Sequence, residues 1–447
     1  MKTNKQVDFI GGSLFPLIIR FSVPAAISLL VTAIYNIVDR IFIGNFNGTT
    51  ALAALSICVP LSFMMIAFGL NCSAGGSTLF SIFNGGGEEH KRNLSFGNAV
   101  TLTLIAETGL MVLLLAFPGF FLKLFGVTDT TYALAYKYYQ ICACGCIFQG
   151  LTMVFCDFVR VSGKPVAGMC VTGSGAITNI FLDALFVGVF GFGVQGAALA
   201  TVIGQIVSTV FGGYLILSGK TMVKVDKHIF KLSKGIWNRI VTCGFAFWIA
   251  QMAMGFISLV YNGQLGKYGG DVAISVYAVI SSIMTFVIMP ASGISQGIQP
   301  ILGTNYGNHN TKRVMETMFK ASLFSVAITA VIWLIVMLFP KQIIELFGGD
   351  EGMLDIGIHA LRLNFMIAPV LGFVMLATTF FQSIGKPGPS IIISLLRQIV
   401  LLVPLIYLFP VLAGLQGIFI AQPVSDALAL VLSLVLVLRE GKKLSSL

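Results

Sequence analysis

The stretch ASLFSVAITAVIWLIVMLFP, residues 321–340, runs for twenty residues without a charged side chain. At about 1.5 Å per helical residue, it is long enough to cross a bilayer hydrocarbon core of about 30 Å. Apolar stretches of this length recur from one end of the chain to the other. The sequence therefore predicts an all-α polytopic membrane protein with twelve transmembrane helices, at 15–42, 52–83, 96–118, 134–158, 166–190, 195–217, 239–264, 272–303, 314–338, 355–381, 388–412 and 417–438.

The overall composition also indicates a membrane protein. Of the 447 residues, 57% are hydrophobic and 10% are charged, whereas about a quarter of the residues of soluble proteins are charged. The eight cysteines lie inside apolar segments, where a thiol behaves as a small hydrophobic group. We therefore expect neither a disulfide framework nor a metal site.

The formal net charge of +10 describes topology rather than a polyanionic partner. With a cytoplasmic N-terminus, 20 of the 27 lysine and arginine residues fall on one side of the predicted helices. This bias is the positive-inside pattern of membrane proteins, and it fits an even number of crossings. We expect a bacterial cytoplasmic (inner) membrane location with both termini cytoplasmic, and no nucleic-acid partner.

The chain contains an internal repeat. A shift of 222 residues superimposes Phe117-Pro118 on Phe339-Pro340, Leu124-Phe125-Gly126 on Leu346-Phe347-Gly348, and Gly163-Lys164-Pro165 on Gly385-Lys386-Pro387. Each copy holds six predicted helices, an even number, so both copies enter the membrane in the same orientation. The prediction is an N-lobe at 1–217, a lysine-rich cytoplasmic linker at 218–238 and a C-lobe at 239–447, with the substrate path between the lobes.

Charged residues inside the apolar spans are the first candidates for function. A charge at mid-membrane costs about 2.5 to 3.5 kcal/mol on insertion scales, so it usually faces a partner or an aqueous cavity. The candidates are Asp39, Glu107, Asp157 and Asp183 in the first copy, and Arg397 and Asp426 in the second. The shift of 222 places Tyr261 at the position of Asp39 and Leu405 at that of Asp183, so these acidic groups belong to the first copy alone.

Asp183 and Asn179 are four residues apart and share one helix face. A buried carboxyl group there could exchange a proton or bind sodium through oxygen, or it could be a polar clasp between helices. Asp39 is open to a structural interpretation too, because Arg40 follows it directly and both could lie near the outer interface.

The other polar and breaking residues have two interpretations each. Glu107 could have a structural hydrogen-bonding role, and Arg397 and Asp426 could pair with each other. Pro24 removes a backbone hydrogen bond inside the first helix, which also bears Asp39. The predicted kink at Pro24 could be a gate or a static bend.

The sequence of the first helix, Tyr35-Asn36-Ile37-Val38-Asp39-Arg40-Ile41-Phe42-Ile43-Gly44, resembles the first-helix signature of the multidrug and toxic compound extrusion (MATE) transporters. Further resemblances follow at Phe158 to Pro165, Asn179 to Asp183 and Gly193 to Gln205. In the second half, Gly293 to Pro300 and Ser394 to Gln398 fit the branch that includes the staphylococcal multidrug pump type. The resemblance covers nearly the whole chain.

The resemblance implies export of bulky, often cationic and aromatic compounds, driven by inward flow of protons or sodium. It also implies that Asp39, Asn179 and Asp183 take part in ion coupling. The chain departs from the branch at Cys156-Asp157, where a pair of asparagines is common. If Asp157 faces the same cavity, it is a third coupling carboxylate.

The sequence and the resemblance together predict a monomeric drug antiporter with alternating access between two lobes, needing no cofactor besides H⁺ or Na⁺. Drug would bind mainly by apolar and aromatic contact with the membrane-embedded residues Tyr35, Met65, Met153, Phe155, Met284, Met289 and Gln296. A lipid-linked oligosaccharide flippase of the same superfamily is the first alternative, although Arg397 is the one strong base at mid-span. A membrane-embedded enzyme is the second, although the four histidines fall in loops or near helix ends.

Overall fold

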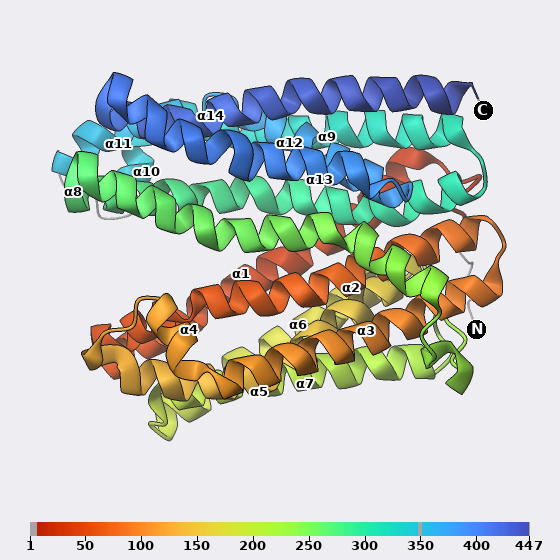
Figure 1. Ribbon diagram of the computed structural model, residues 1–447, viewed down its shortest axis with the longest axis horizontal. Helices are drawn as coiled ribbons and strands as arrows, with labels where there is room; N and C mark the ends of the chain where they lie inside the picture. Colours follow the sequence, from red (N-terminus) through yellow and green to blue (C-terminus); the bar gives the residue numbers. More distant parts are fainter. Residues whose placement is uncertain (1–6, 347–350, 447) are drawn as a thin grey trace. The chain divides into compact units, whose positions relative to one another are not determined.

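A computed structural model of the protein describes residues 7–346 and 351–446. Within these ranges the regular structure is helical throughout, as predicted, and no strand is present (Figure 1). The elements are α1 (Leu14–Ile57), α2 (Val59–Gly85), α3 (Glu89–Ala116), α4 (Pro118–Leu124), α5 (Asp129–Val161), α6 (Pro165–Asp183), η1 (Ala184–Val189), α7 (Gly193–Leu217), η2 (Lys227–Phe230), α8 (Lys234–Gly307), α9 (Thr311–Leu338), α10 (Pro340–Leu346), α11 (Glu351–Asn364), α12 (Ala368–Ser383), α13 (Pro387–Leu395), η3 (Leu396–Leu401) and α14 (Leu402–Ser445).

The apolar helices account for the twelve predicted crossings. Ten helical runs of the described chain are long and apolar enough to span a membrane, and the bent pair Met353–Asn364 and Ala368–Ser383 adds an eleventh. One of the ten, Pro387–Ser445, has 59 residues and breaks at Ala413 and Gly414. A crossing needs about 20 residues, so this run supplies two spans and brings the number to twelve.

Backbone breaks repeat with the sequence. Gly48 interrupts α1 at φ 78°, and Gly270 interrupts α8 at φ 62°. Glycine suits both breaks because it adopts positive φ without a Cβ clash. The shift of 222 residues relates three pairs of positive-φ positions, Gly48 with Gly270, Gly87 with His309, and Gly163 with Gly385. The two copies predicted from the sequence are therefore copies in backbone conformation too.

Contacts divide the described chain into two compact units. Unit 1 holds residues 7–12 and 27–251, and unit 2 holds residues 13–26, 252–346 and 351–446. The beginning of α1 packs inside unit 2, where Gly297 leaves room for Ser22. The beginning of α8 packs inside unit 1, where the side chain of Asn71 donates to the carbonyl of Val241 at 3.3 Å. The bounds of the two units are defined by contacts, whereas the bounds of the two predicted lobes, at 217 and 239, come from the sequence repeat.

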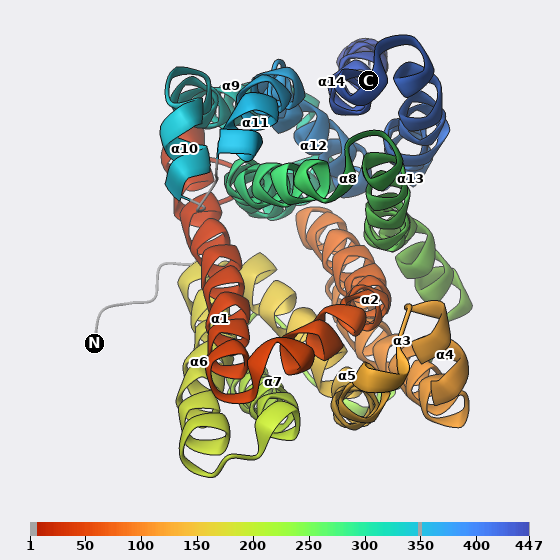
Figure 2. The same ribbon diagram turned by 90° about the vertical axis from the view of Figure 1, so that its left-hand side faces the viewer.

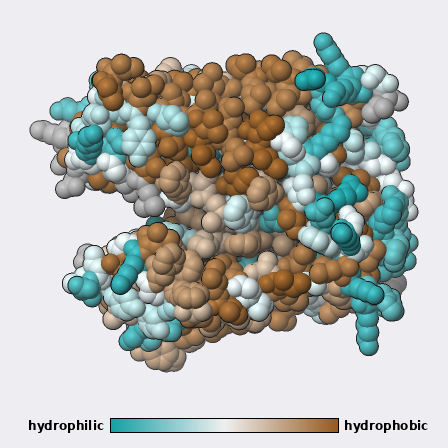
Figure 3. All heavy atoms as spheres, in the orientation of Figure 1, coloured by the Kyte–Doolittle hydropathy of each residue, from teal (hydrophilic) through white to brown (hydrophobic). Residues whose placement is uncertain are grey.

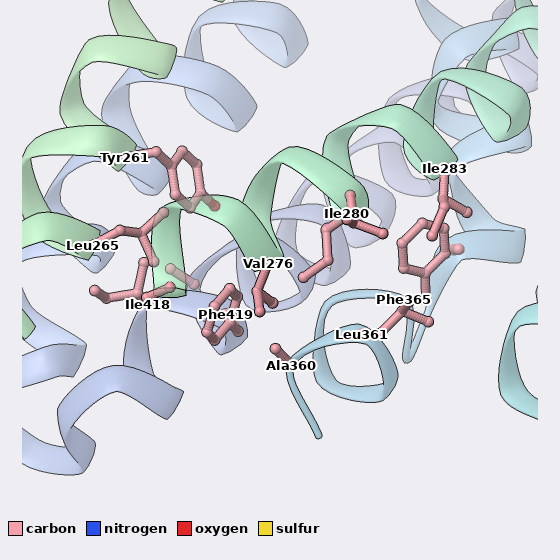
Figure 4. Packing of buried hydrophobic residues seen from close by; sticks show 14 of the residues in the cluster. Tyr261, Leu265, Val276, Ile280, Ile283, Ala360, Leu361, Phe365, Ile418 and Phe419 are labelled. Carbon is pink, nitrogen blue, oxygen red and sulfur yellow. The ribbon is translucent and has the colours of Figure 1, made fainter. Parts of the chain in front are cut away.

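Each unit has its own apolar core. In unit 2, α8, α11 and α14 bring Tyr261, Leu361 and Phe419 into one buried cluster (Figure 4). In unit 1, Phe158 meets the rings of Phe80 and Phe96 edge-on, at 5.4 and 5.1 Å between centroids. In a bilayer such close packing is stabilised mainly by dispersion contacts, because lipid tails are as apolar as the side chains.

The flanks of the helices are apolar on the outside as well. Figure 3 shows hydrophobic residues over these flanks and hydrophilic residues gathered at helix ends. Ile177 and Phe181 of α6 are 72% and 67% exposed. Exposed apolar surface of this kind is suited to contact with lipid.

Candidate functional site

Asp183 is the most enclosed carboxyl group among the predicted coupling residues. It is the last residue of α6, its side chain is fully buried, and neither carboxyl oxygen has a hydrogen-bond donor in the described chain. The π-helix Ala184–Val189 follows it directly. Single π-turns widen a helix locally and often occur at functional sites. Asp183 therefore stands at an irregular point of an otherwise regular span.

Asn179 lies one turn before Asp183 on the same face of α6. Its side-chain nitrogen donates to Thr201 Oγ1 of α7 at 3.3 Å, and its side-chain oxygen has no donor in the described chain. Two glycines allow α6 and α7 to lie side by side (Figure 2). A Cβ atom on Gly204 would lie 2.7 Å from the carbonyl oxygen of Gly175 and 3.3 Å from Cβ of Asn179.

Asp39 of α1 belongs to the same cluster. It is 6% exposed, and it lies close enough to Asp183 for the two carboxylates to repel each other when both are charged. Its Oδ1 atom has no donor in the described chain. The structure thus brings together Asp39, Asn179 and Asp183, although more than a hundred residues separate Asp39 from the other two in the sequence.

Three neighbours of this cluster are not among the residues predicted from the sequence. Tyr138 and Cys142 of α5 lie within electrostatic range of Asp39, and Thr201 of α7 bonds Asn179. Tyr138 and Cys142 are four residues apart, so their shared helix face was a usable signal. Thr201 lies in the stretch Gly193 to Gln205, which resembles the MATE family but indicated no role for this residue.

The cluster has the chemistry of a site for a proton or a hard cation. Four buried oxygen atoms lack a donor in the described chain: both of Asp183, one of Asp39 and one of Asn179. Burying a carboxylate without a partner is costly, and binding of a proton or a cation would relieve that cost. Carboxylate and amide oxygens are also the ligands that hard cations prefer.

Asp157 is in a different environment. It forms an ion pair with Arg160 one turn later in α5, and the hydroxyl of Ser73 donates to it. Cys156, the residue before Asp157, contacts Gly168 and Thr172 of α6, and Thr172 is eleven residues before Asp183, roughly 16 Å along the helix. The structure does not bring Asp157 together with the cluster.

Glu107 of α3 is fully buried between glycines. A Cβ atom on Gly150 of α5 would lie 2.9 Å from its Oε1, and one on Gly69 of α2 would lie 3.2 Å away. Because glycine has no side chain, Gly69 and Gly150 leave the space that the carboxyl group of Glu107 fills. Cys146 donates to the carbonyl of Glu107 at 3.2 Å, which fixes α3 against α5.

Arg397 and Asp426 of unit 2 form the predicted pair. Arg397 Nε donates to Asp426 Oδ1 at 2.6 Å, and Gln422 donates to the same oxygen at 3.0 Å. Arg397 lies in the π-helix Leu396–Leu401. Tyr261, the residue at the repeat position of Asp39, lies within electrostatic range of Asp426 and stacks on Tyr277 at 4.5 Å. Arg397 thus neutralises the buried carboxylate of Asp426 within unit 2.

The predicted drug contacts are divided between the units. Tyr35, Met65, Met153 and Phe155 lie in unit 1, and Met284, Met289 and Gln296 lie in unit 2. Met65 is a member of a buried cluster with Leu61 and Tyr139. Phe155 and Met284 are half-buried and pack against the cores of their units.

Pro24 lies inside α1 within the part that packs in unit 2. Two residues later, between Ala26 and Ile27, α1 passes from unit 2 to unit 1. The non-helical break of α1 is at Gly48 rather than at Pro24.

Known proteins match the chain over its whole length. The multidrug export protein MepA of Staphylococcus aureus (strain bovine RF122 / ET3-1) is 24% identical over 440 residues, covering 98% of this chain and 96% of MepA. The MepA protein of Staphylococcus haemolyticus is 25% identical over 439 residues, with the same coverage. A solved structure of a MATE protein in the bent conformation matches with a TM-score of 0.93 at 24% identity, covering 100% of this chain and 99% of that one.

The same fold is found in the outward-facing conformation of a multidrug resistance MATE family transporter, with a TM-score of 0.92, 24% identity and full coverage of both chains. The family model described as MatE matches this chain twice, at residues 24–185 and 247–408. These two matches follow the internal repeat. The chain therefore belongs to MatE, the family of multidrug and toxic compound extrusion (MATE) transporters.

Proposed function

We propose that this chain exports bulky, cationic and aromatic organic compounds across a bacterial cytoplasmic membrane, in exchange for protons or sodium ions. The observation that carries the coupling part is the fully buried carboxyl group of Asp183, which has no donor in the described chain and lies near Asp39. Family membership and the multidrug export named for the relatives support the substrate class.

Coupling follows from the cost of leaving these carboxylates charged. An ion drives a conformational change only by binding the two states with different affinity. When Asp183 and Asp39 are neutralised, the closed cluster in unit 1 is stable. When they lose their ion, two like charges share a site that water does not reach, and a state that opens this site is favoured. The ion gradient then drives alternating access.

The topology in this proposal has both termini in the cytoplasm, following the predicted positive-inside bias. Drug binds by apolar and aromatic contact with the seven residues named from the sequence, and the chain acts as a monomer. Membership of the extrusion family supports export over the flippase alternative.

The coupling role predicted for Asp157 stays a prediction, and its environment gives it a specific form. Because Asp157 is paired with Arg160, protonating it would leave the buried guanidinium without that carboxylate. We expect Asp157→Asn to change the ion dependence of transport if this step belongs to the cycle. An unchanged ion dependence, together with a lower melting temperature, would assign the pair to stability.

Everted membrane vesicles test the function directly. A fluorescent cationic dye is added outside vesicles containing the chain, on the cytoplasmic face, and a pH gradient and a sodium gradient are imposed separately. The proposal expects one of the two gradients to drive dye movement that vesicles without the chain lack. If neither gradient does so, the antiporter function is wrong.

A further inference from the structure

Unit 1 has a cavity of about 680 Å³ at the end where α3 begins and α7 ends. Glu89 and Arg92 of α3, the last residues of α7 and the linker segment 219–225 form its wall. Its volume is within the roughly 300–1,000 Å³ of small-molecule sites. Thr201 of the coupling cluster is sixteen residues before Leu217, roughly 24 Å along α7, so the cavity is a separate site.

The wall is fixed by hydrogen bonds between α3 and the linker. The guanidinium of Arg92 donates to the carbonyl of Met222 at 2.9 Å and to the side chain of Asn84 at 3.2 Å. The backbone nitrogen of Lys224 donates to Oδ1 of Asn93 at 3.2 Å. These hydrogen bonds hold the linker predicted from the sequence against α3, where it forms part of the cavity wall.

Polar groups in the wall favour an anion. Arg92 Nε and Thr221 Oγ1 are buried without a hydrogen-bond partner in the described chain. The carboxylate of Glu89 also lies in the wall, and Lys224 meets it at 2.6 Å and Arg92 at 3.6 Å. Two cations and one carboxylate leave one positive charge. Unused donors beside a net positive charge suit an oxyanion such as a phosphate group.

The outer face of α7 indicates where the phosphate comes from. Val210, Tyr214 and Leu217 are 65%, 56% and 72% exposed and follow one another at helical spacing toward the cavity. Lys220 then lies 5.2 Å over the ring of Tyr214. An acyl chain lying along this apolar face would bring a lipid headgroup to the cavity mouth.

We propose that this cavity binds the phosphate group of an anionic phospholipid. Arg92 and Lys224 meet its charge, and the hydroxyl of Thr221 donates a hydrogen bond to it. Val314 occupies the position of Arg92 in the second copy, so the site belongs to unit 1 alone.

The test is a titration of the purified full chain in detergent micelles with phosphatidylglycerol, read by thermal unfolding, with phosphatidylcholine as the neutral lipid. Phosphatidylglycerol should raise the melting temperature more than phosphatidylcholine. Lys224→Gln should weaken its apparent affinity about fivefold. Glu89→Gln should strengthen it, because it removes the one carboxylate from the wall. Both side chains are largely exposed, so both variants should fold.

Two further variants complete the test. Thr221→Val replaces a hydroxyl with a methyl of similar volume, and it should weaken phosphatidylglycerol binding without lowering stability in its absence. Lys442→Gln removes an exposed lysine near the end of α14 and should have no effect. The proposal is overturned if Lys442→Gln matches Lys224→Gln, or if Glu89→Gln weakens binding. Equal protection by inorganic phosphate would overturn the assignment to a lipid.

Discussion

Replacing Asp183 by asparagine removes a charge from the coupling cluster while keeping the shape of the side chain. Asp183 is fully buried and accepts no hydrogen bond within the described chain. The amide group introduced by this substitution therefore breaks no bond that the carboxyl group makes. We expect Asp183→Asn to fold and insert, with a change in stability below about 1 kcal/mol.

The effect on coupling should be large by comparison. A buried ion without a partner costs several kcal/mol, and this cost is what the bound proton or sodium ion relieves. Moving a two-state equilibrium from 1:99 to 99:1 takes about 5.5 kcal/mol. If Asp183 supplies even half of that, about 2.8 kcal/mol, its loss changes the ratio of the two states about 100-fold. Asp183→Asn should therefore lower gradient-driven dye transport by about two orders of magnitude.

The measurement compares dye flux in everted vesicles at matched protein levels, with melting temperature as the test of folding. Asp129→Asn is the control, because Asp129 is an exposed aspartate in the first turn of α5. The control should transport like the parent chain. Parental transport by Asp183→Asn would show that the carboxyl group has no coupling role, and a large drop in its melting temperature would assign it to structure.

Three substitutions test the surrounding architecture. Arg397→Met leaves Asp426 buried without its cation and should lower the free energy of unfolding by about 3–5 kcal/mol. The double variant Arg397→Met with Asp426→Leu should recover most of the lost melting temperature. No recovery would show that the two residues do not act as a pair. Gly204→Ala forces its methyl group against a carbonyl of α6, which should lower the free energy of unfolding by about 1–3 kcal/mol and reduce transport. Gly213→Ala, in the same helix, meets only ordinary contacts and should be tolerated. Tyr261→Phe removes a buried hydroxyl that has no hydrogen-bond partner in the described chain. The free energy of unfolding should therefore increase by about 1 kcal/mol, and the melting temperature should rise. A lower melting temperature would show that the hydroxyl has a partner.

Much of the fold followed from the sequence because the bilayer imposes simple rules. Apolar stretches must be long enough to cross, and a copied unit carries its breaks with it, as Gly48 and Gly270 do. The packing of the beginning of α1 inside unit 2 was not predictable, because periodicity shows which face is apolar but not which helix covers it.

The candidate site was predictable only in part. A charge in an apolar span is conspicuous, so Asp39 and Asp183 could be found, and their spacing from other groups on the same helix could be used. The pairing of Asp157 with Arg160 was within reach of the same reasoning, since they are three residues apart. Proximity across helices, such as that of Tyr138 to Asp39, depends on helix rotation and could be found only in the structure.

The difference between the two copies has a thermodynamic consequence. In unit 1, no hydrogen-bond donor of the described chain meets the carboxylate of Asp183, so in the proposed mechanism its charge is met by an ion from outside. In unit 2, the guanidinium of Arg397 forms an ion pair with Asp426, and because it is part of the chain it is present at every ion concentration. Only a group whose occupancy varies with the gradient can transmit the free energy of that gradient. In the proposed mechanism, the pairing with Arg397 therefore excludes Asp426 from ion coupling, whereas Asp183 remains able to respond to the coupling ion.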